Sequence, residues 1–172
     1  MRRECVESMI RVNHAGEYAA VCIYHGQKMV LRDSHEAEKI EEMRQQELVH
    51  FNYFDKVICE RRIRPTVFMP VWHVAAVALG CVTAIMGKEA AMACTEAVEE
   101  VICEHYDEQS GILERSGREH ELRKAIMQFR EEEREHMEVA VEQGAEHALG
   151  YRALSMAVKA ACRVGIAVSK VW

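Results

Sequence analysis

Two copies of the pattern Glu-x-x-His occur in this chain, one at Glu47 and His50 and the other at Glu133 and His136. Side chains three residues apart lie on the same face of a helix, so each copy would present a carboxylate and an imidazole in one direction. Two such pairs, together with one further Glu from each of two other helices, form the ligand set of helical bundles that hold two iron or manganese ions. The repeated pattern therefore predicts a dinuclear metal site if two further Glu are available.

Two single glutamates, Glu17 and Glu99, are the candidates for the remaining ligands. Each lies within the apolar stripe of a predicted helix, so its carboxylate is expected to face the core. Glu47 follows Glu17 by 30 residues, and Glu133 follows Glu99 by 34 residues. A lone Glu followed by Glu-x-x-His thus occurs twice at nearly the same interval, which indicates two helical hairpins that each supply three ligands.

Neighbouring acidic residues leave two of these assignments open. Glu96 and Glu100 compete with Glu99, since a small rotation of the helix would turn one of them inward instead. Glu132 competes with Glu133 in the same way, although only Glu133 reproduces the three-residue spacing of the other motif. The pattern favours Glu99 and Glu133 and does not by itself exclude their neighbours.

The candidate ligands share a chemistry that suits hard or borderline metal ions. They offer four carboxylates and two imidazoles and no thiolate, which is typical of iron and manganese sites. Four carboxylates also balance the charge of two divalent cations, whereas buried carboxylates without a cation must take up protons. The predicted metal ligands are Glu17, Glu47, His50, Glu99, Glu133 and His136.

An all-α fold is expected to position these ligands. The chain has 172 residues with only two Pro and nine Gly, and this length is typical of one domain. Apolar periodicity continues through long stretches, and residue 80 or residue 87, both Gly, is expected to bend or interrupt the third of them. The predicted helices cover residues 8–32, 35–61, 71–110, 118–148 and 151–170, the last of these being an additional apolar C-terminal helix.

Charge and cysteine usage limit the possible partners and compartments. The formal net charge is −6, which gives no reason to expect a nucleic-acid partner. The seven Cys are an odd number without a C-x-x-C pair, so reduced thiols in an intracellular compartment are expected. The N-terminal residues contain no apolar signal core, and a cytosol-facing chain without a cleavable presequence is the expectation.

Two apolar stretches, residues 67–84 and 153–172, suggest contact with a membrane surface. The first is interrupted by Pro70 and Gly80, and the second carries three cationic side chains. A helix that crosses a bilayer needs about 20 predominantly apolar residues, so we expect both stretches to lie at the interface rather than to cross it. From pattern alone, an ordinary buried helix and an ordinary terminal helix remain the alternative.

Several motifs resemble those of the demethoxyubiquinone hydroxylases of ubiquinone biosynthesis. They are Asn-His-Ala-Gly-Glu-Tyr at 13–18, Gln-Glu-x-x-His at 46–50, Ala-Met-Ala-Cys-Thr at 91–95, His-Tyr at 105–106 and Phe-Arg-x-Glu-Glu-x-Glu-His at 129–136. The resemblance extends over nearly the whole chain. One departure is Asn13, where the family usually has Asp, and it concerns the surroundings of the ligands and not the ligands themselves.

This resemblance implies a ferritin-like four-helix bundle that holds two iron ions through the six residues named above. It also implies an O2-dependent monooxygenase that hydroxylates the ring of 2-polyprenyl-3-methyl-6-methoxy-1,4-benzoquinol to give 3-demethylubiquinol. His105 and Tyr106 fall on a pair that the family associates with quinone and electron handling; by pattern alone, a packed Tyr and a solvated His are favoured. No dinucleotide fingerprint is present, so electrons would come from a separate reductase, from NADH directly or from the quinol.

The resemblance further implies where the protein works and with what. The expected location is peripheral, on the cytoplasmic face of the inner or plasma membrane in a bacterium, or on the matrix side of the mitochondrial inner membrane in a eukaryote. The expected partners are the polyprenyl quinol, O2, the membrane surface and other ubiquinone-biosynthesis proteins. The apolar stretches at 67–84 and 153–172 would form the mouth through which the quinol head group enters.

Three other functions use parts of the same pattern. A ferritin-like iron store or peroxide scavenger would need the same ligands but no quinol channel. A di-iron hydroxylase that acts on modified tRNA would need a basic face, which this sequence lacks. A metal-free helical scaffold would need none of the six residues.

Overall fold

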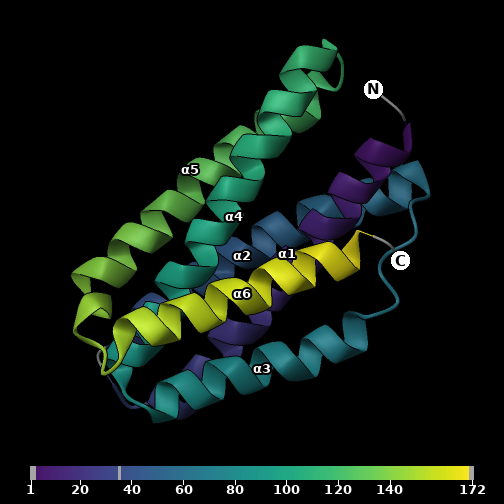
Figure 1. The fold of residues 1–172 in the computed structure, drawn as a ribbon. Helices are drawn as coiled ribbons and strands as arrows, with labels where there is room; N and C mark the ends of the chain where they lie inside the picture. The colour runs from purple at the N-terminus through teal and green to yellow at the C-terminus, as the bar shows by residue number, and fades with distance from the viewer. Residues whose placement is uncertain (1–2, 35, 171–172) are drawn as a thin grey trace.

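The computed structural model describes residues 3–34 and 36–170, and this part of the chain is helical and contains no strand. The predicted all-α class is confirmed. Figure 1 shows the helices in order. They are α1 (Arg3–Leu31), α2 (Glu36–Arg61), α3 (Met69–Ile85), α4 (Lys88–Ser116), α5 (His120–Glu142), the 3-10 turn η1 (Ala145–His147) and α6 (Tyr151–Ser169).

Two helical hairpins form the centre of the fold, as the duplicated ligand pattern predicts. Helix α1 packs along α2, and α4 packs along α5. The remaining two helices lie outside these hairpins, because α3 packs chiefly on α1 and α6 chiefly on α4 (Figure 1). The arrangement is that of a ferritin-like bundle with two additional helices, not one.

The third predicted helix, 71–110, is divided in the structure into two helices. The division is at Gly87, whose φ of 124° is a conformation that side chains with a Cβ rarely adopt. Helix α3 ends at Ile85 and lies outside the central hairpins, and α4 begins at Lys88. The predicted end at residue 110 is also wrong, since α4 continues to Ser116.

Gly80 does not interrupt α3, although the sequence made it a candidate for a break. It faces α1, and a Cβ at this position would overlap the backbone carbonyl of Ile23. Gly26 on α1 has the same relationship to the carbonyl of Val77 on α3. These two glycines therefore allow the backbones of α1 and α3 to approach closely, which fixes α3 against the bundle.

The predicted fourth and fifth helices, 118–148 and 151–170, are shorter in the structure than expected. Helix α5 covers His120–Glu142, and the predicted continuation to residue 148 is replaced by Gly144, at a φ of 93°, and by η1. Helix α6 begins at Tyr151 as expected. These differences do not affect the ligand motifs, which lie in the middle of α2 and α5.

The predicted core faces of α2 and α5 are confirmed by burial. On α2 the positions spaced by three and four are buried, and the same holds on α5. Both Glu-x-x-His motifs lie within these apolar stripes, so their polar side chains are enclosed by the core. The buried stripe residues are Ile40, Met43, Glu47, His50, Phe54 and Val57 on α2, and Leu122, Ile126, Phe129, Glu133, His136 and Ala140 on α5.

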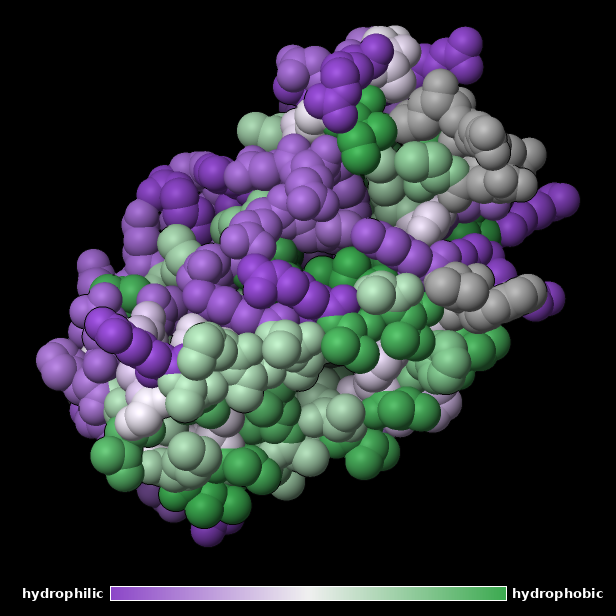
Figure 2. Space-filling model, in the orientation of Figure 1, coloured by the Kyte–Doolittle hydropathy of each residue, from purple (hydrophilic) through white to green (hydrophobic). Residues whose placement is uncertain are grey.

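The surface is divided into a hydrophilic and an apolar part. Figure 2 shows hydrophilic side chains over the upper part of this face and apolar side chains over the lower part, where α3 and α6 lie. On α3 the exposed residues include Val74 and Ile85, and on α6 they include Met156 and Val164. Within residues 3–34 and 36–170, no helix is both long and apolar enough to cross a membrane.

Candidate metal centre

The four helices of the two hairpins bring all six predicted ligands together at the centre of the bundle. They form two overlapping groups, and within each group the candidate ligand atoms lie within 4.8 Å of one another. Glu47 and Glu133 belong to both groups, so each could be shared between two metal ions. The first group is Glu17, Glu47, His50 and Glu133, and the second is Glu47, Glu99, Glu133 and His136, all buried.

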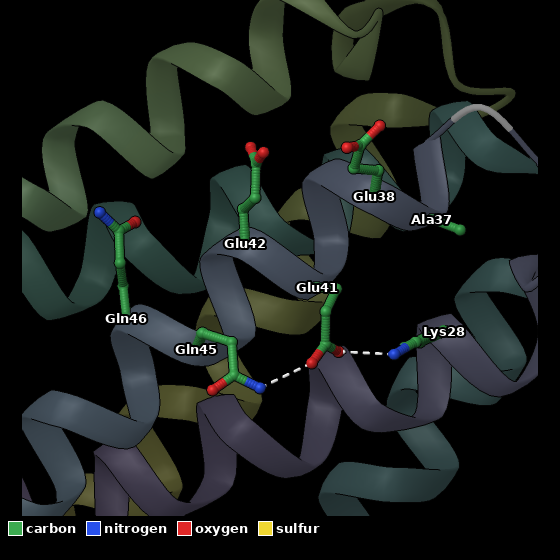
Figure 3. Close-up of a pocket in the computed structure, with 7 residues that line it drawn as sticks. All are labelled: Lys28, Ala37, Glu38, Glu41, Glu42, Gln45 and Gln46. Atoms are coloured by element: carbon green, nitrogen blue, oxygen red, sulfur yellow. Dashed lines mark hydrogen bonds and ion pairs between the residues drawn. The ribbon is translucent and has the colours of Figure 1, made fainter.

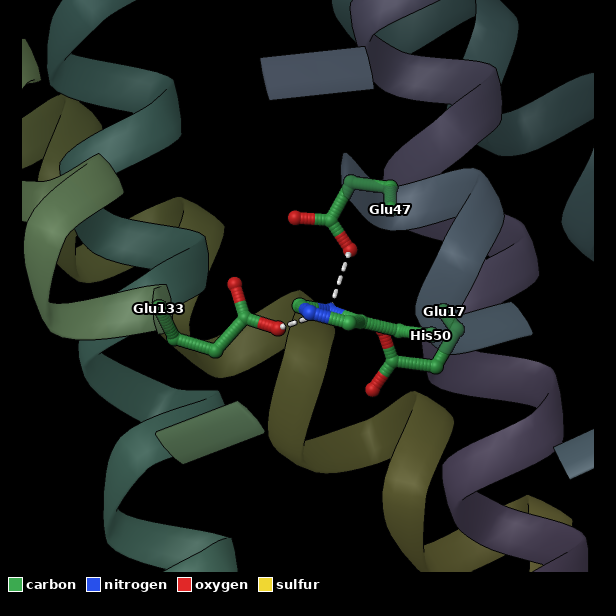
Figure 4. A group of neighbouring side chains, drawn as sticks. All are labelled: Glu17, Glu47, His50 and Glu133. Atoms are coloured by element: carbon green, nitrogen blue, oxygen red, sulfur yellow. Dashed lines mark hydrogen bonds and ion pairs between the residues drawn. The ribbon is translucent and has the colours of Figure 1, made fainter. Parts of the chain in front are cut away.

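Three carboxylates converge on one nitrogen of His50 (Figure 4). Its Nδ1 lies 3.0 Å from Glu133, 3.4 Å from Glu17 and 3.7 Å from Glu47. One nitrogen carries at most one proton and can satisfy one acceptor, so three carboxylates around it exceed what hydrogen bonding can use. A cation shared between the nitrogen and the carboxylate oxygens would use all of them.

The second imidazole repeats this geometry. Nδ1 of His136 lies 3.0 Å from Glu47 and 3.2 Å from Glu133. The two histidines therefore face the two shared carboxylates from the two hairpins. This arrangement follows from the duplicated spacing, because each motif projects its Glu and its His from the same helix face toward the other motif.

The opposite nitrogen of each histidine is held by a residue of the other motif. Nε2 of His50 contacts Glu132 at 2.6 Å, and Nε2 of His136 contacts Gln46 at 2.6 Å. In a neutral ring whose Nε2 is the donor, the lone pair lies on Nδ1, which faces the carboxylates and is the nitrogen that could bind a metal ion. Gln46 and Glu132 each directly precede a motif Glu, and the sequence reasoning gave no supporting role to either.

Two tyrosines hold the single glutamates, again across the hairpins. Tyr24 on α1 donates from its hydroxyl to Oε1 of Glu99 at 2.5 Å, and Tyr106 on α4 donates to Oε1 of Glu17. Tyr24 was missed by the sequence reasoning. The signal that could have found it is spacing, since Tyr24 follows Glu17 by seven residues and Tyr106 follows Glu99 by seven residues.

Several buried carboxylate oxygens in the cluster lack a hydrogen-bond donor. They are Oε2 of Glu17, Oε2 of Glu99 and both oxygens of Glu47. Glu47 Oε1 is within ion-pair distance of His136 Nδ1, but the direction of that contact does not make a hydrogen bond. Buried polar atoms normally have partners, so these orphaned carboxylate oxygens within the two ligand groups fit the donor set that two metal ions require.

Without metal, the cluster must hold protons in place of cations. Burial raises the pKa of Glu17 to about 8 and raises the pKa of Glu99 well above its usual range. Burial alone would lower the pKa of His136, but the close contacts with the carboxylates of Glu133 and Glu47 outweigh it and raise that pKa to about 11. The same competition raises the pKa of His50. Proton uptake and metal binding are therefore alternatives at this site.

Glu96 and Glu100 point away from the cluster, whereas Glu132 contacts Nε2 of His50 and belongs to neither ligand group. Glu96 accepts a hydrogen bond from the Tyr151 hydroxyl at 2.8 Å, and Glu100 pairs with Lys159 at 2.5 Å. Both contacts are with α6, on the outer side of α4. Glu99 is therefore the one member of this run that reaches the cluster, which settles the alternative that the pattern left open.

Comparison with known proteins agrees with this geometry. The sequence model of the family described as "Ubiquinone biosynthesis protein COQ7" matches residues 4–169. The chain belongs to this family. The match confirms the resemblance drawn from the sequence motifs over nearly the whole of this chain.

Relatives of this COQ7-family protein are named as hydroxylases. It is 45% identical over 170 residues to the NADPH-dependent 3-demethoxyubiquinone 3-hydroxylase, mitochondrial, of Dictyostelium discoideum, covering 98% of this chain and 78% of the relative. It is 44% identical to the protein of that name from Homo sapiens, with the same coverage. It is also 44% identical to the 3-demethoxyubiquinol 3-hydroxylase of Rhodospirillum rubrum, covering 96% of this chain and 77% of the relative. These names support the predicted hydroxylase and not the iron-storage alternative.

His105 and Tyr106 point in different directions in this COQ7-family protein. Tyr106 reaches Glu17 in the cluster, whereas His105 lines a polar cavity of about 210 Å³ beside Arg163 and Lys170. Burial, followed by the charge of Lys170, lowers the pKa of His105 to about 4, so its ring is neutral at pH 7. The two neighbours therefore belong to different parts of the structure.

Asn13, the position that departs from the family pattern, forms a reciprocal amide pair with Gln109. Asn13 donates to Gln109 at 2.9 Å, and Gln109 donates back at 2.7 Å. The same Gln109 amide nitrogen lies 2.7 Å from Nε2 of His105. Asn13 thus positions His105 through Gln109, and in the described part of the chain its side chain forms no hydrogen bond with a candidate ligand.

A broad acidic depression of about 740 Å³ lies on the surface beside α1 and α2. In Figure 3, Glu41 pairs with Lys28 at 2.8 Å and accepts a hydrogen bond from Gln45 at 2.6 Å. Of its described lining residues, Gln46 alone forms a hydrogen bond with a residue of the cluster, His136. The rest of the depression is a solvated face with ion pairs.

An apolar cavity of about 340 Å³ lies between α1, α3, α4 and α6. Its lining is mostly small side chains, and it includes Gly16, which directly precedes Glu17, and Trp72 on α3. The indole of Trp72 donates to the Ser169 hydroxyl at 3.1 Å, which ties α3 to the end of α6. The two apolar stretches singled out in the sequence thus form two walls of one cavity.

Proposed function

We propose that this protein hydroxylates the ring of a 2-polyprenyl-3-methyl-6-methoxy-1,4-benzoquinol, with O2 as the oxygen source, at a centre of two iron ions. The observation that carries the proposal is the double cluster, in which two groups of buried Glu and His share two carboxylates. The proposal is supported by the family to which the chain belongs and by the names of its relatives.

The proposed ligands divide into shared and single ones. Glu47 and Glu133 would be shared by the two ions, Glu17 and His50 would hold one of them, and Glu99 and His136 would hold the other. When bound, two ferrous ions supply the electrons and open coordination positions that O2 reduction requires. The four carboxylates neutralise the four positive charges, and the buried site excludes bulk water from the reacting atoms.

The protein's own groups hold this centre in one geometry. Tyr24 and Tyr106 each occupy one oxygen of a single Glu, which leaves the other oxygen as the ligand atom. Phe129 packs against the His50 ring, with ring centroids 4.2 Å apart. Because the ligands are fixed from behind, little reorganisation is needed when the metals bind.

The apolar cavity is the proposed site for the first isoprenoid units of the substrate. Its volume of about 340 Å³ is lined by small side chains next to Glu17, so a quinol ring at its inner end would lie beside the metal centre. Val74 and Ile85 on α3 and Val164 on α6 are exposed, and the lower part of the face in Figure 2, over these two helices, is apolar. We propose that this face rests on the membrane, so that the insoluble tail of the substrate would not have to leave the bilayer.

The electron donor is proposed to be a reduced nicotinamide nucleotide. The relatives from Dictyostelium discoideum and Homo sapiens carry "NADPH-dependent" in their names, so NADPH should be compared with NADH. His105 is proposed to act at the polar cavity that it lines, and Tyr106 is proposed to act by positioning Glu17. Neither residue needs to contact the donor directly.

Product analysis tests this function. The full chain is reconstituted with Fe²⁺ without oxygen, mixed with a short-tailed demethoxyquinol and NADPH, and then exposed to ¹⁸O2. We expect a product that has gained one ¹⁸O atom on the ring, and no product from the Glu99→Gln variant. Oxidation of the iron with recovery of unchanged quinol would contradict the proposal and favour iron storage.

A further inference from the structure

The polar contacts that support the two halves of the proposed centre match each other except for one charge. Each single Glu is held by a Tyr, and each His is held through Nε2 by the residue that precedes the motif Glu of the other hairpin. On His50 that residue is the carboxylate Glu132, but on His136 it is the neutral amide Gln46. One charge therefore breaks the symmetry of the site.

We propose that this difference makes the two metal positions unequal, so that the His50 position binds its metal ion first and more tightly than the His136 position. The inference rests on the proposed dinuclear site and adds an order of filling to it. Glu132 and Gln46 are positioning residues in this proposal, since each acts on the metal through a histidine.

The physical reason lies in what each partner does to the imidazole. A carboxylate that accepts the Nε2 proton draws positive charge toward that end of the ring, so Nδ1 becomes a stronger donor to a cation. An amide oxygen fixes the same tautomer but brings no net charge. The ligands facing each ion are otherwise matched, with two shared carboxylates, one single carboxylate and one imidazole at each position.

Glu132 is held in place for this role. Its Oε2 contacts His50 at 2.6 Å, and its Oε1 accepts from Gln128 at 2.9 Å. Its side chain is 29% exposed, so solvent reduces the effect of its charge but does not remove it. Gln46 contacts His136 at the same distance of 2.6 Å, which makes the two contacts a matched pair that differs in charge.

Anaerobic titration with Fe²⁺ tests the proposal through binding, independently of catalysis. For the metal-free wild-type chain we expect two calorimetric steps of different affinity. Glu132→Gln should weaken the tighter step about 10- to 100-fold, the range found for partners of metal-bound histidines. Gln46→Glu should instead increase the Fe²⁺ affinity of the weaker step. A general loss of folding would not increase affinity.

Removal of each histidine assigns the steps to positions. In the wild type, His50→Ala should abolish the tighter step, whereas His136→Ala should leave it. In the swapped chain, with Glu132→Gln and Gln46→Glu combined, this pattern should reverse. ⁵⁷Fe Mössbauer spectra at one equivalent of iron should show the same exchange of sites.

Failure of this inference and failure of the proposed centre give different results. Two steps that do not respond to either substitution would overturn the order of filling and leave the dinuclear centre intact. Binding of fewer than two ions by the wild-type chain would overturn the centre itself, and the inference with it.

Discussion

The hydroxyl of Tyr24, on α1, donates a hydrogen bond of 2.5 Å to Glu99, on α4. Its counterpart, Tyr106 on α4, donates to Glu17 on α1, so each hairpin supplies the tyrosine that holds the other hairpin's ligand. The crossed contacts couple the orientation of the two hairpins to the geometry of the cluster. They also lead to the first prediction.

Tyr24→Phe should weaken metal binding about 10-fold or more, because Oε1 of Glu99 loses its donor and the carboxylate is free to rotate. Anaerobic Fe²⁺ titration measures this change. The matched control is Tyr151→Phe, which removes a tyrosine hydroxyl from Glu96, 2.8 Å away and outside the cluster. Equal effects of the two substitutions would show that Tyr24 supports folding and not the centre.

Because Glu99 and not Glu96 faces the cluster, the Glu99→Gln and Glu96→Gln variants should bind different amounts of metal. Glu99→Gln should reduce bound iron to one ion per chain or less, since an amide oxygen is a weak, uncharged ligand. Glu96→Gln should retain two ions, because Glu96 faces Tyr151 and not the cluster. Iron analysis after anaerobic reconstitution and desalting measures both, and loss of iron from Glu96→Gln would contradict the assignment.

The metal-free protein should lose stability as the pH rises from about 6 to 9. The folded-state pKa of Glu17, about 8, and that of His136, about 11, both lie above the ordinary values. The folded chain therefore binds more protons than the unfolded chain in this window, and each extra proton lowers the free energy of unfolding by about 1.4 kcal/mol per pH unit.

Urea unfolding at several pH values, with a chelator or with bound metal, measures this dependence. The metal-bound protein should show a much smaller loss over the same window, because the cations replace the protons. Metal-free stability that increased between pH 6 and 9 would show that the cluster is not protonated as described.

Gly80→Ala should destabilise the protein by about 1–3 kcal/mol, the usual range for overpacking. Its new Cβ would meet the carbonyl of Ile23 and force α3 away from α1. Gly165→Ala on α6 is the control, because a Cβ there meets nothing within 4 Å, and it should be neutral or slightly stabilising. Thermal unfolding should show a lower midpoint for Gly80→Ala and an unchanged or slightly higher midpoint for Gly165→Ala.

Charged substitutions on α3 should reduce binding to vesicles. Val74 and Ile85 are 68% and 73% exposed, so Val74→Glu with Ile85→Glu places two carboxylates on the apolar face without disturbing the core. Val49→Glu is the control, since Val49 is 62% exposed on α2, away from α3 and α6. Flotation with anionic vesicles compares them, and equal retention of all variants would rule out this face as the membrane contact.

The sequence determined the composition of the candidate metal centre, because its motifs depend on helix periodicity alone. A three-residue spacing puts Glu47 and His50 on one face in any α-helix, and the surrounding apolar residues decide that this face is buried. The same reasoning holds for Glu133 and His136. All six predicted ligands are buried together in the structure for this reason.

Only the tertiary structure decided what holds the ligands and which neighbours reach them. The crossed contacts of Tyr24 and Glu132 join residues that are 75 and 82 positions apart in the chain. Such contacts depend on how the hairpins are rotated and offset against each other, which no local pattern specifies. The separation of His105 from Tyr106, and the position of α3 outside the central hairpins, likewise follow from packing between helices and not from the spacing within one.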